Sequence, residues 1–331
     1  MNIHILYTGG TIGATHTKIA SAGPAGAWAP AEARDTAPLP VPCGVRISES
    51  RPMNILSENM TAARWRELLL HLRGLALESK DGLIVTHGTD TLAYTACLLS
   101  LVFSAPQLPI VLVSANRPLS DPASNGSENL AAAFAAIKEK IAPGVYAAYR
   151  NSDGRSYLHA GAELLQCPCG SDDFFSVFYG GAAGNPLAEI REGRLCYRKA
   201  PSPGIPPFGD FARDFDGRFR KVLAIKPYVG IDYDSYRLDG TDAVLHGLYH
   251  SATAAAFEDD ADAGAPSVLQ FARRCAKAGV PLCIAPFPQT LPGGGKALYE
   301  TTARMLDAGA IPIKGVSFEM ALVMLMLGLA P

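Results

Sequence analysis

Short apolar runs alternate with segments of helical periodicity along most of this chain. Runs of consecutive apolar residues predict buried parallel strands at residues 3–7, 82–86, 110–114 and 145–149. Helical spacing of the apolar positions between these runs predicts helices over residues 62–77, 91–103 and 127–141. Because strands and helices alternate, we expect an α/β fold with a parallel sheet and helices on both of its faces.

The pattern is interrupted where prolines and glycines accumulate between residues 199 and 216. Missing N–H donors and fixed φ angles oppose regular structure there. We therefore predict a linker at 199–220, between a larger N-terminal domain at 1–198 and a smaller C-terminal α/β domain at 221–331. The alternation resumes after the linker, with strands expected at 221–229, 243–249 and 281–286 and helices at 266–278, 299–307 and 317–329.

A second irregular stretch, rich in alanine, glycine and proline, covers residues 14–42. A long segment without regular structure inside a compact domain is typically either a functional lid or disordered. We favour a lid, because the stretch directly follows the candidate nucleophile described below.

Composition narrows the choice of partners and compartment. The 331 residues are 48% hydrophobic and 18% charged, which is typical of a soluble globular protein long enough for two cores. With 29 basic and 31 acidic residues the formal net charge is −2, so we expect no nucleic-acid partner. The N-terminus lacks the features of a signal peptide and the longest apolar stretch, 320–330, is too short to cross a membrane. We therefore expect a cytoplasmic protein that does not associate with membranes.

The cysteines predict neither a metal site nor a disulfide framework. There are seven of them, mostly in apolar segments, which suits a reducing compartment. The single close pair, Cys167-Pro168-Cys169, has no second pair or histidine couple to complete a zinc site. A redox role for this pair is the less favoured alternative, and we expect no metal.

Two short segments carry the candidate chemistry. Tyr-Thr-Gly-Gly-Thr-Ile-Gly spans residues 7–13, and Thr-His-Gly-Thr-Asp-Thr spans residues 86–91. Each follows or completes an apolar strand and places threonine hydroxyls at its carboxyl end, where open α/β sheets bind their ligands. The first segment does not have the Gly-x-Gly-x-x-Gly spacing and lacks a Gly-Lys-Ser/Thr ending, which argues against a nucleotide-binding loop.

Together the two segments resemble the two signatures of the bacterial-type L-asparaginase family, and the first is most similar to its cytoplasmic type I branch. The resemblance implies a larger N-terminal and a smaller C-terminal α/β domain. It implies hydrolysis of L-asparagine to L-aspartate and ammonia by a threonine nucleophile, without a cofactor. It also implies a homodimer or homotetramer that binds a small amide.

The resemblance implies a role for each residue of the motifs. Thr11 corresponds to the nucleophile, and Thr89 to a second catalytic threonine. Asp90 corresponds to the carboxylate that receives the substrate's α-ammonium group. Its position before a predicted helix also makes it a candidate N-cap, and the two roles are compatible. We interpret the neighbouring His87 as a packed, hydrogen-bonded histidine, because no metal ligands lie near it in the sequence.

Further positions match the substrate-binding parts of the family. Ser57 would hold the α-carboxylate and Glu58 would lie beside the α-ammonium group, although Asn59 and Thr61 also resemble the start of a helix. Substrate-binding positions are also expected at Gly10, Gly88 and Ala115.

Two departures from the family pattern put the activity in question. Gln166 stands where the family has a triad lysine, and no lysine occurs between residues 142 and 198. Trp28 is the only aromatic residue between residues 13 and 42, where the family has a catalytic tyrosine. Glutamine cannot take up a proton near neutral pH, so His16, Lys18, His159 or a water molecule held by Gln166 would have to replace the proton shuttle.

We expect weak or altered asparaginase activity. Two alternatives stay open. The first is a catalytically silent amino-acid-binding sensor, and the second is an amidase for a different amide.

Overall fold

The computed structural model describes residues 1–17, 27–30, 39–103, 106–177, 186–200, 217–257, 267–288 and 298–329. The chain forms two compact units, one of Met1–Val177 and Gly184–Gly217, the other of Phe178–Ala183 and Arg218–Pro331. Most of the expected linker, residues 201–216, lies outside the described residues. The domain boundaries at 198 and 221 therefore stay a prediction.

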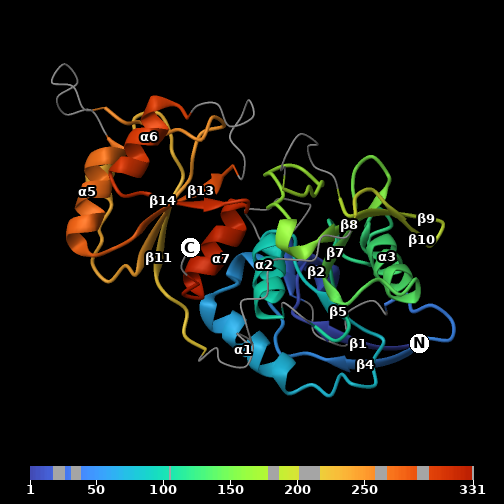
Figure 1. Ribbon diagram of the computed structural model, residues 1–331. Coiled ribbons are helices and arrows are strands. Elements are labelled where there is room, and N and C mark those ends of the chain that lie inside the picture. Colours follow the sequence, from blue (N-terminus) through green and yellow to red (C-terminus); the bar gives the residue numbers. More distant parts are fainter. Residues whose placement is uncertain are drawn as a thin grey trace. The chain divides into compact units, whose positions relative to one another are not determined.

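The first unit is built on an eight-stranded sheet with the order β10-β9-β8-β7-β6-β5-β1-β4 (Figure 1). Five neighbouring strands, β4, β1, β5, β6 and β7, are parallel. The strands β8, β9 and β10 continue the sheet with antiparallel pairing. The strands are β1 (Asn2–Tyr7), β4 (Arg46–Ser50), β5 (Gly82–Thr86), β6 (Pro109–Val113), β7 (Gly144–Arg150), β8 (Ser156–Ala160), β9 (Ala188–Arg191) and β10 (Arg194–Tyr197).

The strands predicted from apolar runs are confirmed, and the strands that the prediction missed lie toward the sheet edges. Every residue of β5 and β6 is buried, which explains their continuous apolar sequence. The edge strands β4 and β10 are both partly exposed, and β4 is rich in polar residues. Apolar runs therefore identify the centre of this sheet and not its margins.

Among the residues that the structure describes, three α-helices accompany this sheet: α1 (Ala62–Arg73), α2 (Leu92–Val102) and α3 (Gly126–Lys138). The side chain of Thr61 caps α1 by accepting a hydrogen bond from the N–H of Arg64 at 3.3 Å, as expected from the helix-start residues. Helix α3 packs Leu130 and Phe134 into one core with Ile84 and Val111 of the sheet. Strand side chains alternate between faces, so the neighbours of Ile84 in β5 are buried on the other face.

The stretch 14–42, predicted to be irregular, contains a small antiparallel sheet of β2 (Ala14–Thr17) and β3 (Ala27–Pro30). This part of the prediction was wrong, because four-residue strands built largely from alanine and threonine give no apolar run. Residues 18–26 and 31–38 lie outside the described residues. A lid role for the stretch stays a prediction.

The second unit contains a four-stranded parallel sheet with the order β11-β12-β13-β14. This confirms the expected smaller α/β part. The missed strand, β14, contains Pro312 and is exposed at both ends. Its elements are β11 (Val222–Ile225), β12 (Ala243–His246), β13 (Leu282–Phe287), β14 (Ile311–Lys314), α5 (Val268–Ala278), α6 (Glu300–Asp307) and α7 (Phe318–Met326).

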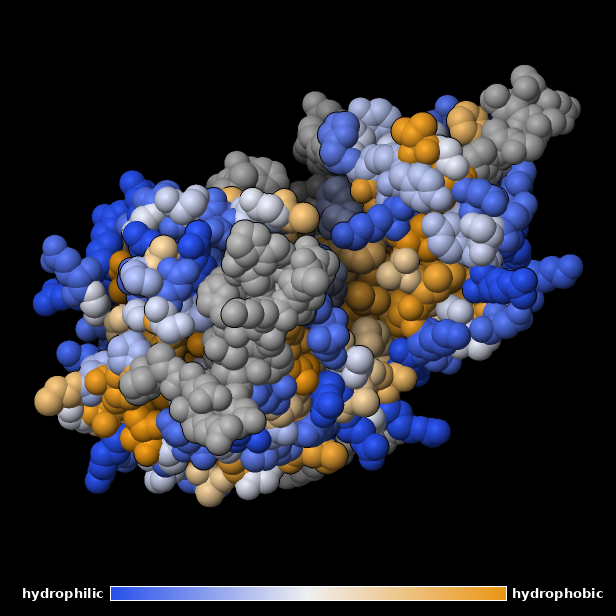
Figure 2. All heavy atoms as spheres, turned by 180° about the vertical axis from the view of Figure 1, so that it is seen from behind, coloured by the Kyte–Doolittle hydropathy of each residue, from blue (hydrophilic) through white to orange (hydrophobic). Residues whose placement is uncertain are grey.

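Hydrophilic residues cover much of the face shown in Figure 2, and apolar residues show between them in separate patches. Among the described residues, no helix is both long and apolar enough to cross a membrane.

Candidate functional site

The two motif segments meet at the carboxyl ends of neighbouring parallel strands. Tyr7 of β1 pairs with Thr86 of β5, and the hydroxyl of Thr8 donates to the carbonyl oxygen of Thr86 at 2.7 Å. Beyond the strands the two turns almost touch, because a Cβ atom on Gly10 would lie 2.3 Å from the nitrogen of Gly88. Gly10 also has a φ of +81°, so only glycine suits this position.

A third segment, the 3-10 helix η4 (Ser57–Asn59), closes the group. The N–H of Gly10 donates to the carbonyl of Ile55 at 2.8 Å. A Cβ atom on Gly88 would lie 2.4 Å from the Ser57 hydroxyl oxygen. The predicted substrate-binding positions Gly10, Gly88 and Ser57 are therefore close neighbours.

Asp90 and Ser57 are joined directly. The Ser57 hydroxyl donates to Oδ2 of Asp90 at 3.2 Å, and its oxygen accepts from the backbone N–H of Asp90 at the same distance. The Thr91 hydroxyl donates to the Ser57 carbonyl at 2.9 Å. Thr91, and not Asp90, occupies the N-cap position of α2. The N-cap role expected for Asp90 was wrong, because its carboxylate turns to the serine.

A cavity of about 270 Å³ opens at this point. Thr89 and Asp90 line it, together with Gln166 and the loop that follows Gln166. The phenol of Tyr94, on α2, donates to Oε1 of Gln166 at 3.0 Å. The described lining residues are Thr89, Asp90, Asn116, Tyr149, Gln166, Cys167, Pro168, Cys169, Gly170, Ser171 and Asp172. They include two carboxylates and neither lysine nor arginine, so the lining seen here is acidic.

The remaining predicted residues are placed as follows. Thr11 begins the 3-10 helix η1 (Thr11–Gly13) directly after Gly10 and is partly exposed. Glu58 is exposed beside Ser57 in η4. Ala115 is completely buried and is not among the described residues that line the cavity, so its substrate-binding role stays a prediction. The structure thus brings the motif backbones together, with Thr89, Asp90 and Gln166 on one cavity.

His87 is the packed histidine that we expected. Its side chain is completely buried, and both ring nitrogens have hydrogen-bond partners. Burial lowers the pKa of His87 to about 4, so the ring is neutral at physiological pH.

Of the candidate replacements for the proton shuttle, Gln166, as the holder of a water molecule, lines the cavity, and His159 does not. His159, in β8, is buried; its Nδ1 lies 2.9 Å from the Ser176 hydroxyl, and burial followed by the charge of Lys199 lowers its pKa to about 3. It is not among the described residues that line the cavity. The side chain of His16 and the whole of Lys18 lie outside the described residues.

Sequence reasoning missed two features near Gln166. Lys199, one residue beyond the interval searched for a lysine, forms an ion pair with Glu163 in the segment that leads to Gln166. Cys167 and Cys169 line the cavity wall, and burial raises the pKa of the Cys167 thiol. Both cysteines lie within three residues of Gln166, and this closeness could have indicated that they belong to the same site. Lys199 was overlooked because it lies in the segment that we interpreted as a linker.

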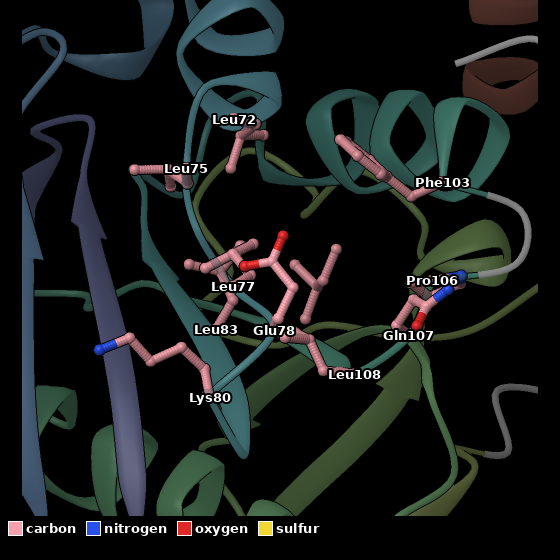
Figure 3. Close-up of a pocket in the computed structure, with 11 residues that line it drawn as sticks. Leu72, Leu75, Leu77, Glu78, Lys80, Leu83, Phe103, Pro106, Gln107 and Leu108 are labelled. Atoms are coloured by element: carbon pink, nitrogen blue, oxygen red, sulfur yellow. The ribbon is translucent and has the colours of Figure 1, made fainter. Parts of the chain in front are cut away.

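A second cavity, of about 540 Å³, lies at the opposite ends of the same strands, next to Leu83 of β5 and Ile110 of β6 (Figure 3). Leucines and Phe103 form most of its wall, with Glu78 and Lys80 as the charged members. It is larger than the first cavity, but it lacks a hydroxyl or thiol nucleophile among its described lining residues. The smaller cavity is therefore the better candidate site.

Comparison with known proteins identifies the family of the chain. The family model "Asparaginase, N-terminal" matches residues 2–202, well over half of the chain. The chain belongs to the asparaginase family. The thermostable L-asparaginase from Thermococcus kodakarensis has a similar structure, with a TM-score of 0.76 and 26% identity over 99% of this chain and 93% of that one. A probable cytoplasmic L-asparaginase from Campylobacter jejuni shares the fold, with a TM-score of 0.68 and 24% identity over 99% and 94%.

Relatives by sequence carry a different name, the D subunit of glutamyl-tRNA(Gln) amidotransferase. The relative from Methanococcus maripaludis is 32% identical over 239 residues, which cover 70% of this chain and 54% of that protein. The relative of the same name from Saccharolobus solfataricus is 28% identical over 284 residues, which cover 84% and 60%. This asparaginase-family chain therefore spans a little over half the length of these relatives.

Proposed function

We propose that this protein is an amidohydrolase that converts L-asparagine to L-aspartate and ammonia through a covalent intermediate on Thr11. The observation that carries the proposal is the cavity lined by Thr89 and Asp90, next to the turns in which Gly10 packs against Gly88. Amide hydrolysis needs a nucleophile, a stabilised oxyanion and contacts for the charged ends of the substrate, and these motifs offer all three.

The reaction proceeds in two halves. The Thr11 hydroxyl oxygen attacks the side-chain carbonyl carbon of the substrate and gives up its proton to water. Backbone N–H groups, with Thr89 as the first candidate, stabilise the oxyanion of the tetrahedral intermediate. Water returns that proton to the leaving nitrogen, the C–N bond breaks, and ammonia departs. A second water molecule then attacks the ester carbon, the carboxylate product is released, and Thr11 regains its hydroxyl proton.

The charged ends of the substrate are assigned to the acidic side of the site. Asp90 and Glu58 favour an α-ammonium group. We assign the α-carboxylate to the Ser57 hydroxyl, which would exchange its hydrogen bond to Asp90 for one to the substrate. Gln166 takes the place of the triad lysine on the cavity wall. Since glutamine supplies neither charge nor a titrating proton, turnover is expected to be slow.

Two other functions are weighed against this one. The names of the amidotransferase relatives favour L-glutamine as an alternative amide, one methylene longer than L-asparagine. The acidic cavity without a described cation favours a silent sensor that binds an amino acid and does not hydrolyse it. We also propose a homodimer or homotetramer in the cytoplasm, without a nucleic-acid partner, on the basis of the family resemblance and the net charge of −2.

The test compares ammonia release from L-asparagine and L-glutamine by the native protein, by Thr11→Ala and by the control Thr241→Ala. Thr241 is a partly exposed threonine of the second unit. Loss of ammonia release in Thr11→Ala alone supports the proposal, and equal rates in all three proteins contradict it. Calorimetry with L-aspartate identifies a sensor, because a sensor binds the amino acid tightly without turnover.

A further inference from the structure

A buried chain of hydrogen bonds runs from α1 to the peptide that precedes Thr89. The indole N–H of Trp65 donates to the Thr95 hydroxyl oxygen at 3.0 Å. The same oxygen lies 2.9 Å from Nε2 of His87, and Nδ1 of His87 lies 2.9 Å from the carbonyl oxygen of Gly88. Trp65, Thr95 and His87 are all buried.

The partners define which nitrogen of His87 carries the hydrogen. The Gly88 carbonyl oxygen can only accept, so Nδ1 is the protonated nitrogen and donates to it. Nε2 of the neutral ring is then an acceptor, and it receives the Thr95 hydroxyl hydrogen. Thr95 in turn accepts from Trp65, so every hydrogen in this chain points in one direction, toward Gly88.

The orientation of the Gly88 carbonyl determines the orientation of the next N–H group. In a trans peptide the carbonyl and the following N–H point in opposite directions. The Gly88 carbonyl points inward to the buried ring of His87, so the N–H of Thr89 points outward, and Thr89 lines the cavity.

We infer that His87 is a positioning residue that holds the Gly88–Thr89 peptide with the Thr89 N–H directed at the cavity, as a preset donor for the oxyanion. The inference rests on the proposed amide hydrolysis and specifies which backbone group serves it. Gly88 needs such a support, because a residue without Cβ can rotate its peptide more freely than any other. Ser57 and Gly10 leave no room for a side chain that would restrict it.

The second unit contains the same local arrangement without any predicted site residue. His246, at the end of β12, is fully buried; its Nδ1 bonds to the carbonyl of Gly247, and its Nε2 lies 2.8 Å from the Tyr233 hydroxyl. A buried histidine bonded to the carbonyl of the next residue can therefore stabilise the fold without any role in a site. The test must separate positioning from stability, and His246 supplies the matched control.

The substitutions His87→Asn and His87→Gln differ in whether the new side chain can still donate a hydrogen bond to the Gly88 carbonyl. In His87→Asn the side-chain amide nitrogen takes the place of Nδ1 and can still donate to Gly88, whereas in His87→Gln it takes the place of Nε2. For His87→Gln we expect kcat to fall about 10²- to 10³-fold, as for loss of one oxyanion donor, with little change in KM. For His87→Asn we expect most of kcat to return, although both variants lose thermal stability.

The orientation of the peptide is measured independently of activity by the backbone amide ¹⁵N and ¹H shifts of Thr89. Loss of the hydrogen bond to the Gly88 carbonyl should move this signal in His87→Gln and leave it near its native position in His87→Asn. His246→Gln should lower thermal stability and leave the Thr89 signal unchanged.

Each outcome decides one question. If His87→Asn and His87→Gln lose kcat equally and their Thr89 signals agree with the native one, His87 is only a packing residue and the inference is wrong. If the native protein hydrolyses no amide, the proposed function fails, while the Thr89 signal still decides whether His87 orients the peptide.

Discussion

The substitution Gln166→Lys tests the proposal that glutamine in place of the family's lysine slows amide hydrolysis. It places an ammonium group on a cavity wall whose described charges are the carboxylates of Asp90 and Asp172. A positioned group that transfers a proton to the leaving nitrogen contributes about 10²- to 10⁴-fold in rate. We expect Gln166→Lys to raise kcat for L-asparagine toward the lower end of this range, because residues 14–42 contain no tyrosine that could assist Thr11.

The substitution also has a cost that can be estimated from the structure. The Tyr94 hydroxyl loses its acceptor, Oε1 of Gln166, at 3.0 Å. One hydrogen bond of this kind contributes about 1 kcal/mol to stability, which corresponds to a fall in melting temperature of roughly 2 °C for a chain of this size. A larger loss would mean that the lysine does not fit the cavity, and the kinetics would then be uninformative about proton transfer.

The assay is coupled ammonia release with L-asparagine, measured as kcat and KM for the native protein, for Gln166→Lys and for Gln107→Lys. Gln107 is an exposed glutamine on the other cavity, so its replacement adds the same charge far from the motif residues. A gain in Gln166→Lys alone supports the reasoning. If the native protein turns over asparagine rapidly and Gln166→Lys slows it, the proton takes another route and the role assigned to position 166 is wrong.

Three further predictions test the packing, the electrostatics and the assembly. Gly10→Ala should abolish activity and lower the melting temperature, because its Cβ would lie 2.3 Å from the nitrogen of Gly88; native-like activity would contradict the close approach of the two turns. Arg191 and Arg198 lower the pKa of Glu189 from 4.5 to about 2, so these ion pairs stabilise the fold above about pH 4.5 and their contribution disappears as the pH falls toward 2. Urea unfolding of Glu189→Gln at pH 3 and pH 6 should show less dependence on pH than the native protein, and an unchanged dependence would refute this assignment. Light scattering at micromolar concentration should give a multiple of 34.9 kDa, and a mass near 34.9 kDa would rule out the oligomer.

The central strands of the fold could be predicted from the sequence because their burial requires an apolar residue at nearly every position. A strand covered on both faces is apolar at nearly every position, as in β5, and the predicted bounds of 82–86 match the structure. Where a strand lies toward an edge, polar residues interrupt the apolar run. For this reason β4 and β9 were missed although they belong to the same sheet. The short strands β2 and β3 were missed for the related reason that their small residues form no apolar run.

The candidate site could be predicted only as far as it consists of local motifs. Gly10 and Gly88 lie in recognisable turns, but their contact depends on the register of β1 against β5, which no local pattern contains. The partner of Asp90 was misjudged for the same reason. Its position favours a helix cap, whereas Ser57, 33 residues earlier in the chain, offers its hydroxyl instead.

Gln166 links these observations to the choice between an enzyme and a sensor. Its hydrogen bond from Tyr94 means that the position is occupied by a side chain with a fixed contact and is not simply a gap left by a lost lysine. Such a contact suits a cavity that binds an amino acid, and it does nothing to move a proton. The Thr89 N–H, as the inferred oxyanion donor, contributes to catalysis only where an amide is hydrolysed. Ammonia release by the native protein and by His87→Gln therefore separates the two functions: an enzyme releases ammonia and loses kcat in the variant, whereas a sensor binds L-aspartate and releases no ammonia in either protein.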